Sequence, residues 1–155
     1  MFEAQVYVRR REALRAALAE RGVKDGLVVL VGNGESPMNY LDNAYPFRQD
    51  SSFLYFVGLA QPGLAASIDL GSGKARLYGE DPSMSEIVWS GPRPTAAELA
   101  SLSGIAETRK RAELASDASS AGRLLYLPSY RAETRAELAE LSGRAYAAVD
   151  AGAAL

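Results

Sequence analysis

Leu27-Val28-Val29-Leu30-Val31 is the stretch that decides the fold. It is a continuous apolar run that follows Asp25-Gly26, and its length and β-branched content are typical of a strand buried on both faces. Such a strand needs a covering layer on each side. The run therefore predicts a central strand within a layered α/β domain.

The segment that precedes this strand favours a helix over residues 3–21. Val6, Leu14 and Leu18 share one stripe of that helix, the arginines lie on the other side, and Gly22 supplies a stop. This is the pattern of an amphipathic helix that covers a sheet.

The segments that follow alternate between strands and helices. Residues 65–70 and 74–78 flank Gly71-Ser72-Gly73, and glycine in a loop of about three residues predicts an antiparallel hairpin. The other predicted elements are helices over 95–103 and 132–141 and a strand over 123–127. Helices that alternate with strands around one hairpin predict a mixed β-sheet with helices on both faces.

Length and charge limit the classes of protein to consider. The 155 residues suit one domain spanning 1–155, large enough to bury roughly 70% of the surface of its unfolded chain. The alanine-rich tail over 145–155 is typical of a domain boundary. Seventeen Lys and Arg against nineteen Asp and Glu give a net charge of −2, which disfavours binding to nucleic acid or to an anionic membrane.

Targeting signals are absent from the sequence as given. No apolar stretch approaches the ~20 residues of a membrane span, and Met-Phe-Glu-Ala-Gln at the start is no secretory signal. The lack of cysteine fits a reducing compartment. We therefore expect a cytoplasmic domain.

Neither cysteine nor histidine occurs in the chain. This removes thiol nucleophiles, thiolate metal sites, and the commonest general base near neutral pH. A metal site here would need oxygen ligands alone, which suit magnesium or calcium better than zinc, manganese or cobalt. Most hydrolytic sites are thereby excluded from this chain.

Two glycine-containing segments invite a phosphate-binding interpretation. Gly32-Asn33-Gly34 follows a predicted strand, but Pro37 occupies the place of the third glycine and no helix obviously follows. Gly71-Ser72-Gly73-Lys74 lacks the first glycine and the Ser or Thr of a phosphate loop. A plain turn and a hairpin turn explain these segments better, and the basic runs over 9–11 and 109–111 are better interpreted as solvated faces.

An unusual cluster lies between Tyr45 and Gly58, where aromatic residues crowd around a proline, an arginine and Asp50. The simplest local interpretation is a polar loop over residues 32–49 that enters a short helix capped by Asp50 or Ser51. The cluster by itself names no chemistry.

Trp89 is the chain's only tryptophan, and Gly91-Pro92 follows it closely. One interpretation is a core anchor, since a buried tryptophan removes about 150–250 Å² from water. The other is an interface residue, because tryptophan and arginine are enriched in binding hot spots, and Arg93 lies on the same loop. The sequence leaves these two interpretations open.

At these two motifs the chain resembles the N-terminal domain of the Xaa-Pro aminopeptidases, within the wider creatinase and prolidase family. The resemblance covers essentially the whole chain. It rests on the order and spacing of these residues: Tyr45, Pro46, Phe47, Arg48, Gln49, Asp50, Ser51, Phe53, Tyr55 and Gly58, then Trp89, Ser90, Gly91 and Arg93.

The resemblance implies a metallopeptidase that removes an N-terminal residue preceding proline. It implies two divalent ions, manganese, cobalt or zinc, held by aspartates, a histidine and glutamates in a later, C-terminal domain. This chain has no histidine and ends where that domain would begin, so no metal or catalytic ligand carries over.

What carries over is an auxiliary role and a fold like that of ribonuclease H. In the family, the N-terminal domain shapes the mouth of the active site and makes dimer or tetramer contacts. Trp89 matches a tryptophan that reaches toward a neighbouring subunit's substrate pocket, and Arg93 would meet a peptide carboxylate or a subunit edge. The segment from Tyr45 to Gly58 is expected to pack its own domain, with Arg48 and Asp50 fixing the loop.

The partners implied are therefore the chain's own catalytic domain, other copies of the enzyme and the peptide substrate. Two alternatives stay open at this point. The complete protein would be a creatinase-like or prolidase-like hydrolase, or the chain would be a freestanding module that binds a peptide or partner through the Trp89 loop.

Overall fold

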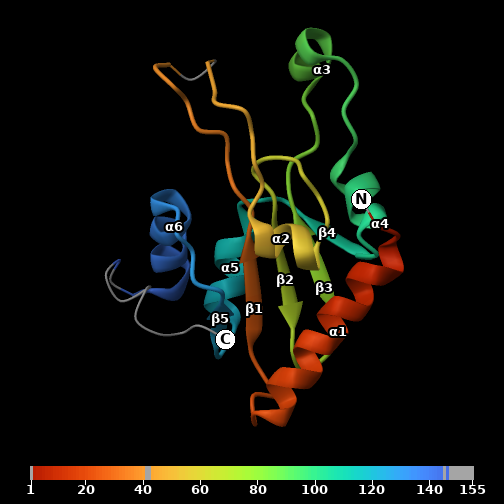
Figure 1. The fold of residues 1–155 in the computed structure, drawn as a ribbon, viewed down its shortest axis with the longest axis vertical. Helices are drawn as coiled ribbons and strands as arrows, with labels where there is room; N and C mark the ends of the chain where they lie inside the picture. Colours follow the sequence, from red (N-terminus) through yellow and green to blue (C-terminus); the bar gives the residue numbers. More distant parts are fainter. Residues whose placement is uncertain (1, 41–42, 145, 147–155) are drawn as a thin grey trace.

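The computed structural model describes residues 2–40, 43–144 and 146, and in it five strands form one mixed sheet (Figure 1). Along the sheet the order is β4-β3-β2-β1-β5, with β1–β5 and β3–β4 parallel and the other two pairs antiparallel. The strands are β1 (Leu27–Val31), β2 (Ala65–Asp69), β3 (Ala75–Tyr78), β4 (Glu107–Arg109) and β5 (Leu124–Tyr126). The predicted mixed sheet and hairpin are confirmed.

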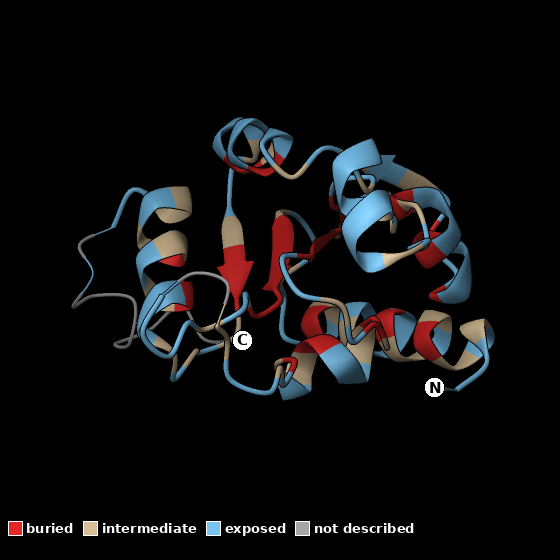
Figure 2. Ribbon diagram, turned by 90° about the horizontal axis from the view of Figure 1, so that it is seen from above, coloured by how far each residue is buried: buried red, intermediate tan, exposed pale blue. Residues whose placement is uncertain are grey.

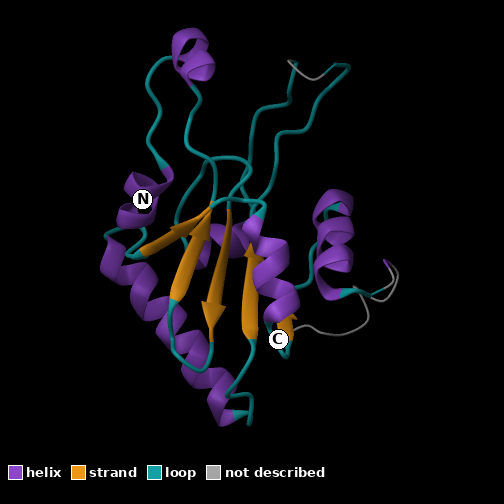
Figure 3. Cartoon of the chain, turned by 180° about the vertical axis from the view of Figure 1, so that it is seen from behind, coloured by secondary structure: helices purple, strands orange, loops and turns teal. Residues whose placement is uncertain are grey.

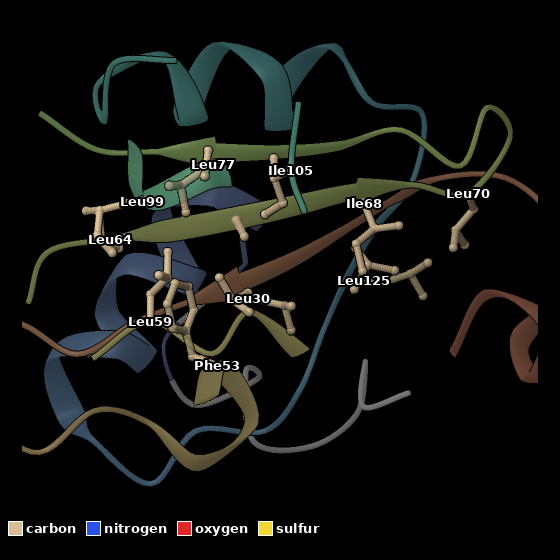
Figure 4. Close-up of a cluster of buried hydrophobic side chains, with 14 of the residues drawn as sticks. Leu30, Phe53, Leu59, Leu64, Ile68, Leu70, Leu77, Leu99, Ile105 and Leu125 are labelled. Carbon is tan, nitrogen blue, oxygen red and sulfur yellow. The ribbon is translucent and has the colours of Figure 1, made fainter. Parts of the chain in front are cut away.

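Helices cover both faces of this sheet, as predicted. The structure has α1 (Ala4–Glu20), α2 (Ser51–Phe56), α3 (Met84–Ser90), α4 (Ala96–Leu102), α5 (Glu113–Ser120) and α6 (Ala132–Ser142). One core cluster joins the sheet to α1, α2 and α4 (Figure 4), and a second joins it to α5 and α6. Figure 2 shows the buried residues gathered on the strands and on the helix sides that face them.

The run Leu27–Val31 serves both clusters because successive side chains of a strand point to opposite faces. Val28 and Leu30 pack toward α1 and α2, whereas Val29 and Val31 pack in the cluster of α5 and α6. All five residues of the run are buried. The strand is interior as predicted, although β2 holds the middle position of the sheet.

Three elements differ from the sequence-based expectation. The Trp89 segment is the helix α3 and not a loop, while β4 and α5 were not predicted at all. Strand β4 has three residues, Glu-Thr-Arg, too short and too polar to show a period of two. Helix α5 is mostly polar, and a single fully buried residue, Leu114, anchors it.

Helix α1 was predicted correctly, but its arginines were not all placed correctly. Its buried residues are Tyr7, Arg11 and Leu18, so one arginine lies on the face toward the sheet. Val6 and Leu14 are only partly buried. Periodicity marks the stripe of a helix, but it does not tell when a charged side chain lies within that stripe.

Two further observations concern the limits of the chain. The tail interpreted as a domain boundary, 145–155, lies outside the described residues except for Tyr146. Among the described residues, no helix combines the length and the apolar character that crossing a membrane requires.

Candidate functional site

Two segments extend from one end of the sheet, and they are the candidate functional site (Figures 1 and 3). We call residues 80–95, which carry α3, the α3 arm, and residues 34–40 and 43–48, between β1 and α2, the first arm. Within the described ranges, no three or more His, Cys, Asp or Glu side chains are grouped to hold a metal ion.

The α3 arm is ordered by its own local hydrogen bonds. The Ser83 backbone N–H donates to Glu86 Oε2 at 2.8 Å and the Glu86 N–H donates to Ser83 Oγ at 3.3 Å, which together form a capping box. The Ser83 hydroxyl also donates to Glu86 Oε2 at 2.6 Å. This hydrogen bond, and then the one from the Ser83 N–H, lower the pKa of Glu86, with a smaller contribution from the charge of Arg93. Gly91 ends the helix at φ 82°, where glycine is favoured.

No residue of α3 is buried. The exposed fractions of Met84, Val88 and Trp89 are 75%, 74% and 87%. Positions 84 and 88 share a helix face, and 89 adjoins it, so three large apolar side chains meet water on one short helix. The core-anchor interpretation of Trp89 is wrong for this chain, because its indole packs in neither core cluster.

The base of the α3 arm is held to the domain by two carboxylates. The Ala96 N–H, at the start of α4, donates to Asp81 Oδ1 at 2.7 Å, which links the two ends of the arm. The Arg111 N–H donates to Glu80 Oε1 at 2.9 Å. These two hydrogen bonds fix the base of the α3 arm to the domain. They therefore help to orient Trp89, although neither involves that residue.

Arg93, the second predicted interface residue, is exposed on the same arm. Its guanidinium makes no hydrogen bond or ion pair with another described residue. The structure therefore brings Trp89 and Arg93 onto one projecting segment, with the cation available to a partner group.

The first arm is an extended excursion from the sheet. A bridge between Pro37 and Ala44 holds its two sides together in antiparallel fashion. Met38, Tyr40 and Tyr45 are exposed along it. Like the α3 arm, the first arm exposes large apolar and aromatic side chains to water. Their exposure brings no stability to a monomeric domain, and it is typical of an interaction surface.

The base of the first arm is organised by Gln49, which is 3% exposed. Its Oε1 accepts the Asn33 N–H at 2.6 Å and the Asp50 N–H at 2.9 Å, while its Nε2 donates to Gln61 O at 2.8 Å. Asn33 is buried beside it and donates from Nδ2 to Arg48 O at 2.9 Å. The segment 32–34 thus lies at the base of the first arm. The next helix, α2, begins only at Ser51, so this glycine segment does not form the helix N-terminus that a phosphate site would need.

Within the Tyr45–Gly58 motif, the packing residues lie toward its C-terminal end. Asp50 caps α2 by accepting the Phe53 N–H at 2.9 Å, as predicted, and Phe53 is fully buried in the first core cluster. Gly58 adopts φ 79°, and a Cβ there would overlap the ring of Tyr7. These residues join α2 to α1.

The other motif residues are more exposed. Phe47 is half-buried, and the side chains of Tyr45, Pro46 and Arg48 face solvent on the first arm. The guanidinium of Arg48 meets no acceptor among the described residues, so the structure does not show it fixing the loop.

Tyr55 is exposed on the outer side of α2 and lies under a cation. The Arg10 guanidinium carbon is 4.2 Å from the centre of its ring, and Arg10 also donates to Tyr55 O at 2.9 Å. This part of the motif helps to hold α1 against α2.

Arg11 was not anticipated as a structural residue. It is 6% exposed and donates to Phe56 O at 2.8 Å, to Ser103 O at 2.9 Å and to Gly104 O at 3.1 Å. Burial lowers the pKa of its guanidinium to about 10, so it stays protonated at neutral pH. The sequence holds one sign of this burial: Arg11 lies four residues after Tyr7, so the two side chains share the helix face that packs against the domain.

Sequence comparison finds probable Xaa-Pro aminopeptidases that are similar to this chain. The profile of the family "Aminopeptidase P, N-terminal domain" matches residues 7–125. A probable Xaa-Pro aminopeptidase of Aspergillus oryzae is 31% identical over 96 residues, which are 62% of this chain and 19% of that protein. One of Talaromyces stipitatus is 28% identical over 109 residues, 70% of this chain and 22% of that protein. The chain thus spans about a fifth of the length of these relatives.

Solved structures show the same fold. Pseudomonas aeruginosa aminopeptidase PepP matches with a TM-score of 0.75 at 19% identity, over 90% of this chain and 32% of that one. Zinc-substituted Escherichia coli aminopeptidase P in complex with product matches with a TM-score of 0.72 at 17% identity, with the same coverages. At these identities the likeness establishes the architecture of the sheet and its helices.

Proposed function

Since this chain belongs to the aminopeptidase P N-terminal domain family, we propose that it is the noncatalytic N-terminal part of a cytoplasmic Xaa-Pro aminopeptidase. The complete enzyme would release an N-terminal residue that precedes proline. The names of the relatives favour this activity over a creatinase-like or prolidase-like one. The role of the chain would be to shape access to the active site and to make contacts between subunits.

The observation that carries this proposal is the exposure of Trp89 at the end of an ordered arm. A large aromatic side chain that lies outside the core of its own domain gains free energy only when a partner covers it. The capping box and the Asp81 tether hold the arm in place beforehand, which lowers the entropy cost of that contact.

The two arms would act as walls of a substrate pocket. Trp89 would line the pocket of a neighbouring subunit, in a dimer or tetramer, and Arg93 would face a peptide carboxylate or the subunit edge. A narrow mouth suits a peptide with a free amino end and proline second, because shape and oriented contacts set such selectivity.

The two divalent metal ions of the family do not fit the residues of this chain. The sequence has no histidine, and the described residues offer no cluster of metal-ligating side chains. We therefore assign no step of hydrolysis to this chain, and the ions would be held by the C-terminal catalytic domain.

An activity assay tests the noncatalytic role. The purified chain is incubated with manganese, cobalt or zinc and an Xaa-Pro peptide, and a mock preparation serves as the control. We expect the same background turnover in both. Turnover above the mock preparation would contradict the proposal.

A substitution in the complete enzyme tests the role of the α3 arm. Trp89→Ala is expected to lower kcat/KM for an Xaa-Pro peptide by about tenfold or more, with thermal stability nearly unchanged because the indole is exposed. Tyr130→Ala is the matched control, since Tyr130 is also exposed but lies on neither arm. Unchanged kinetics for Trp89→Ala would contradict the proposed role.

The freestanding-module alternative makes a different prediction about the gene. It requires the natural reading frame to end near Leu155, whereas the proposed enzyme requires a frame that continues into two closely spaced aspartates and a later histidine. Sequencing that frame separates the two.

A further inference from the structure

A cavity of about 370 Å³ lies between α1, the turn of the β2–β3 hairpin and the loop that joins α4 to β4. Its apolar lining includes Val8, Ile68, Ala75 and Ile105. Ligand pockets in proteins begin at about 300 Å³ and are lined mostly by apolar groups with a few polar ones. No residue of either arm lines this cavity, so it is separate from the site proposed above.

Two cations line the same cavity without a partner. Arg15 and Lys74 are exposed, and neither side chain makes a hydrogen bond or ion pair with another described residue. The Arg15 guanidinium lies directly against Gly73, where a Cβ would overlap it. Gly73, at φ 74°, therefore leaves the space that this guanidinium fills.

The remaining charges of the lining are mostly neutralised. Arg11 is already bound to carbonyl groups of Phe56, Ser103 and Gly104. Glu107 pairs with Arg76 at 2.8 Å and with Arg109 at 3.3 Å. Two unpaired cations thus face one unpaired carboxylate in the lining, that of Glu12.

From this arrangement we infer that the cavity binds a small organic carboxylate with a short aliphatic chain. The Arg15 fork takes the carboxylate in a bidentate manner, and Lys74 adds a second positive charge. The aliphatic chain covers Val8, Ala75 and Ala106, the apolar lining residues that still meet water, and removes their surface from it. A doubly charged inorganic anion would interact with Arg15 and Lys74 but would leave the apolar lining exposed to water.

The test is a titration of the ¹⁵N-labelled chain with hexanoate, followed by NMR. The amides of Lys74, Ala75 and Ile105 are expected to shift in a saturable way. Hexanamide, which has the same chain without the charge, and acetate, which has the charge without the chain, are each expected to bind at least about fivefold more weakly.

Charge variants sharpen the test. Arg15→Gln combined with Lys74→Gln is expected to weaken hexanoate binding about tenfold, since both proposed contacts are lost. Glu12→Gln is expected to strengthen it about twofold, because a like charge is removed. Arg9→Gln, an exposed arginine of α1 that does not line the cavity, is the control and leaves the affinity within about twofold.

Three results would overturn the inference. The first is the absence of saturable shifts with hexanoate. The second is equal binding of hexanoate and hexanamide. The third is an equal effect of Arg9→Gln and the double variant, which would show a response to net charge and not to this cavity.

Discussion

Arg11 shows how one side chain can join three parts of the chain. It comes from α1 and donates to the backbone carbonyls of Phe56, Ser103 and Gly104, with no carboxylate needed. Each of these carbonyls would lack this donor in the folded state if the guanidinium were removed, and a buried unsatisfied carbonyl is costly.

We predict that Arg11→Met lowers the free energy of unfolding by about 2–4 kcal/mol, because the volume stays similar while the donors are lost. Arg9→Met is the matched control, since Arg9 is exposed on the same helix, and is expected to change stability by less than about 0.5 kcal/mol. Urea unfolding of both variants measures this. Equal effects would show that Arg11 contributes no more than a surface residue.

Gly58 is a second residue whose identity is required by a distant side chain. We predict that Gly58→Ala destabilises by roughly 2–5 kcal/mol, from the positive φ together with overlap with Tyr7. Gly22 has a similar φ, 82°, with no atom within 4 Å of the position that a methyl group would take, so Gly22→Ala is expected to cost only about 1–2 kcal/mol.

A double-mutant cycle separates the two causes. In a Tyr7→Leu background, the cost of Gly58→Ala should fall toward that of Gly22→Ala, since the ring is gone. The free energy of unfolding is measured for each variant. A cost that does not change with residue 7 would attribute the whole effect to backbone strain.

At the level of elements, Tyr78 links the sheet to α5. Its hydroxyl donates to Asp117 Oδ2 at 2.6 Å and lies 3.0 Å from Ser67 Oγ, so β2, β3 and α5 meet at one buried phenol. Burial, and then the hydrogen bond to Asp117, raise the pKa of Tyr78 to about 12.

This raised pKa predicts a loss of stability at alkaline pH. Between about pH 10 and about pH 12 the unfolded state loses the Tyr78 proton while the folded state keeps it, so the free energy of unfolding falls as pH rises through this window. Tyr78→Phe should be less stable near neutral pH by about 1 kcal/mol but lack this component of the pH dependence. Urea unfolding across the window tests it, with Tyr130→Phe as the exposed control. Parallel pH profiles for Tyr78→Phe and the unsubstituted chain would contradict it.

A helix or strand could be predicted when the residues that specify it are close to it in the sequence. Helices α2 and α4 were located correctly because their signals lie beside them in the sequence: the cap Asp50 for α2, and Pro94 and Gly104 on either side of α4. Helix α3 has an equally local signal in Ser83 and Glu86, but the proline and glycine nearby favour a loop when the sequence is considered alone. Strand β4 has no local signal, and pairing with β3 alone makes it a strand.

At the scale of the whole molecule, Trp89 is a probe of assembly, and these 155 residues contain no other tryptophan. We predict that acrylamide quenches the fluorescence of this chain almost as readily when folded as when unfolded, since the indole is 87% exposed. In the complete enzyme, the part of the fluorescence that Trp89→Phe removes should be quenched severalfold less, since the proposed contact with a neighbouring subunit would cover the arm. Equal quenching in the complete enzyme would contradict a docked α3 arm.

The candidate site was only partly visible in the sequence. Trp89 and Arg93 lie four residues apart in the sequence and both are exposed in the structure, whereas the sequence left burial and exposure of the indole equally open. The Tyr45–Gly58 motif was assigned to packing, and it divides in the structure between an exposed first arm and the buried side of α2.

The sequence by itself determined the interior strand Leu27–Val31, the hairpin and the capped helices, because each depends on a few residues adjacent in the chain. The tertiary structure alone decided that Arg11 is buried, that Gln49 holds the foot of the first arm and that Trp89 stands outside the core. Arg11 bonds to groups 45 and 92 residues away, and Gln49 to a backbone amide 16 residues away. No periodicity encodes such contacts, since they exist only after the sheet has brought distant segments together.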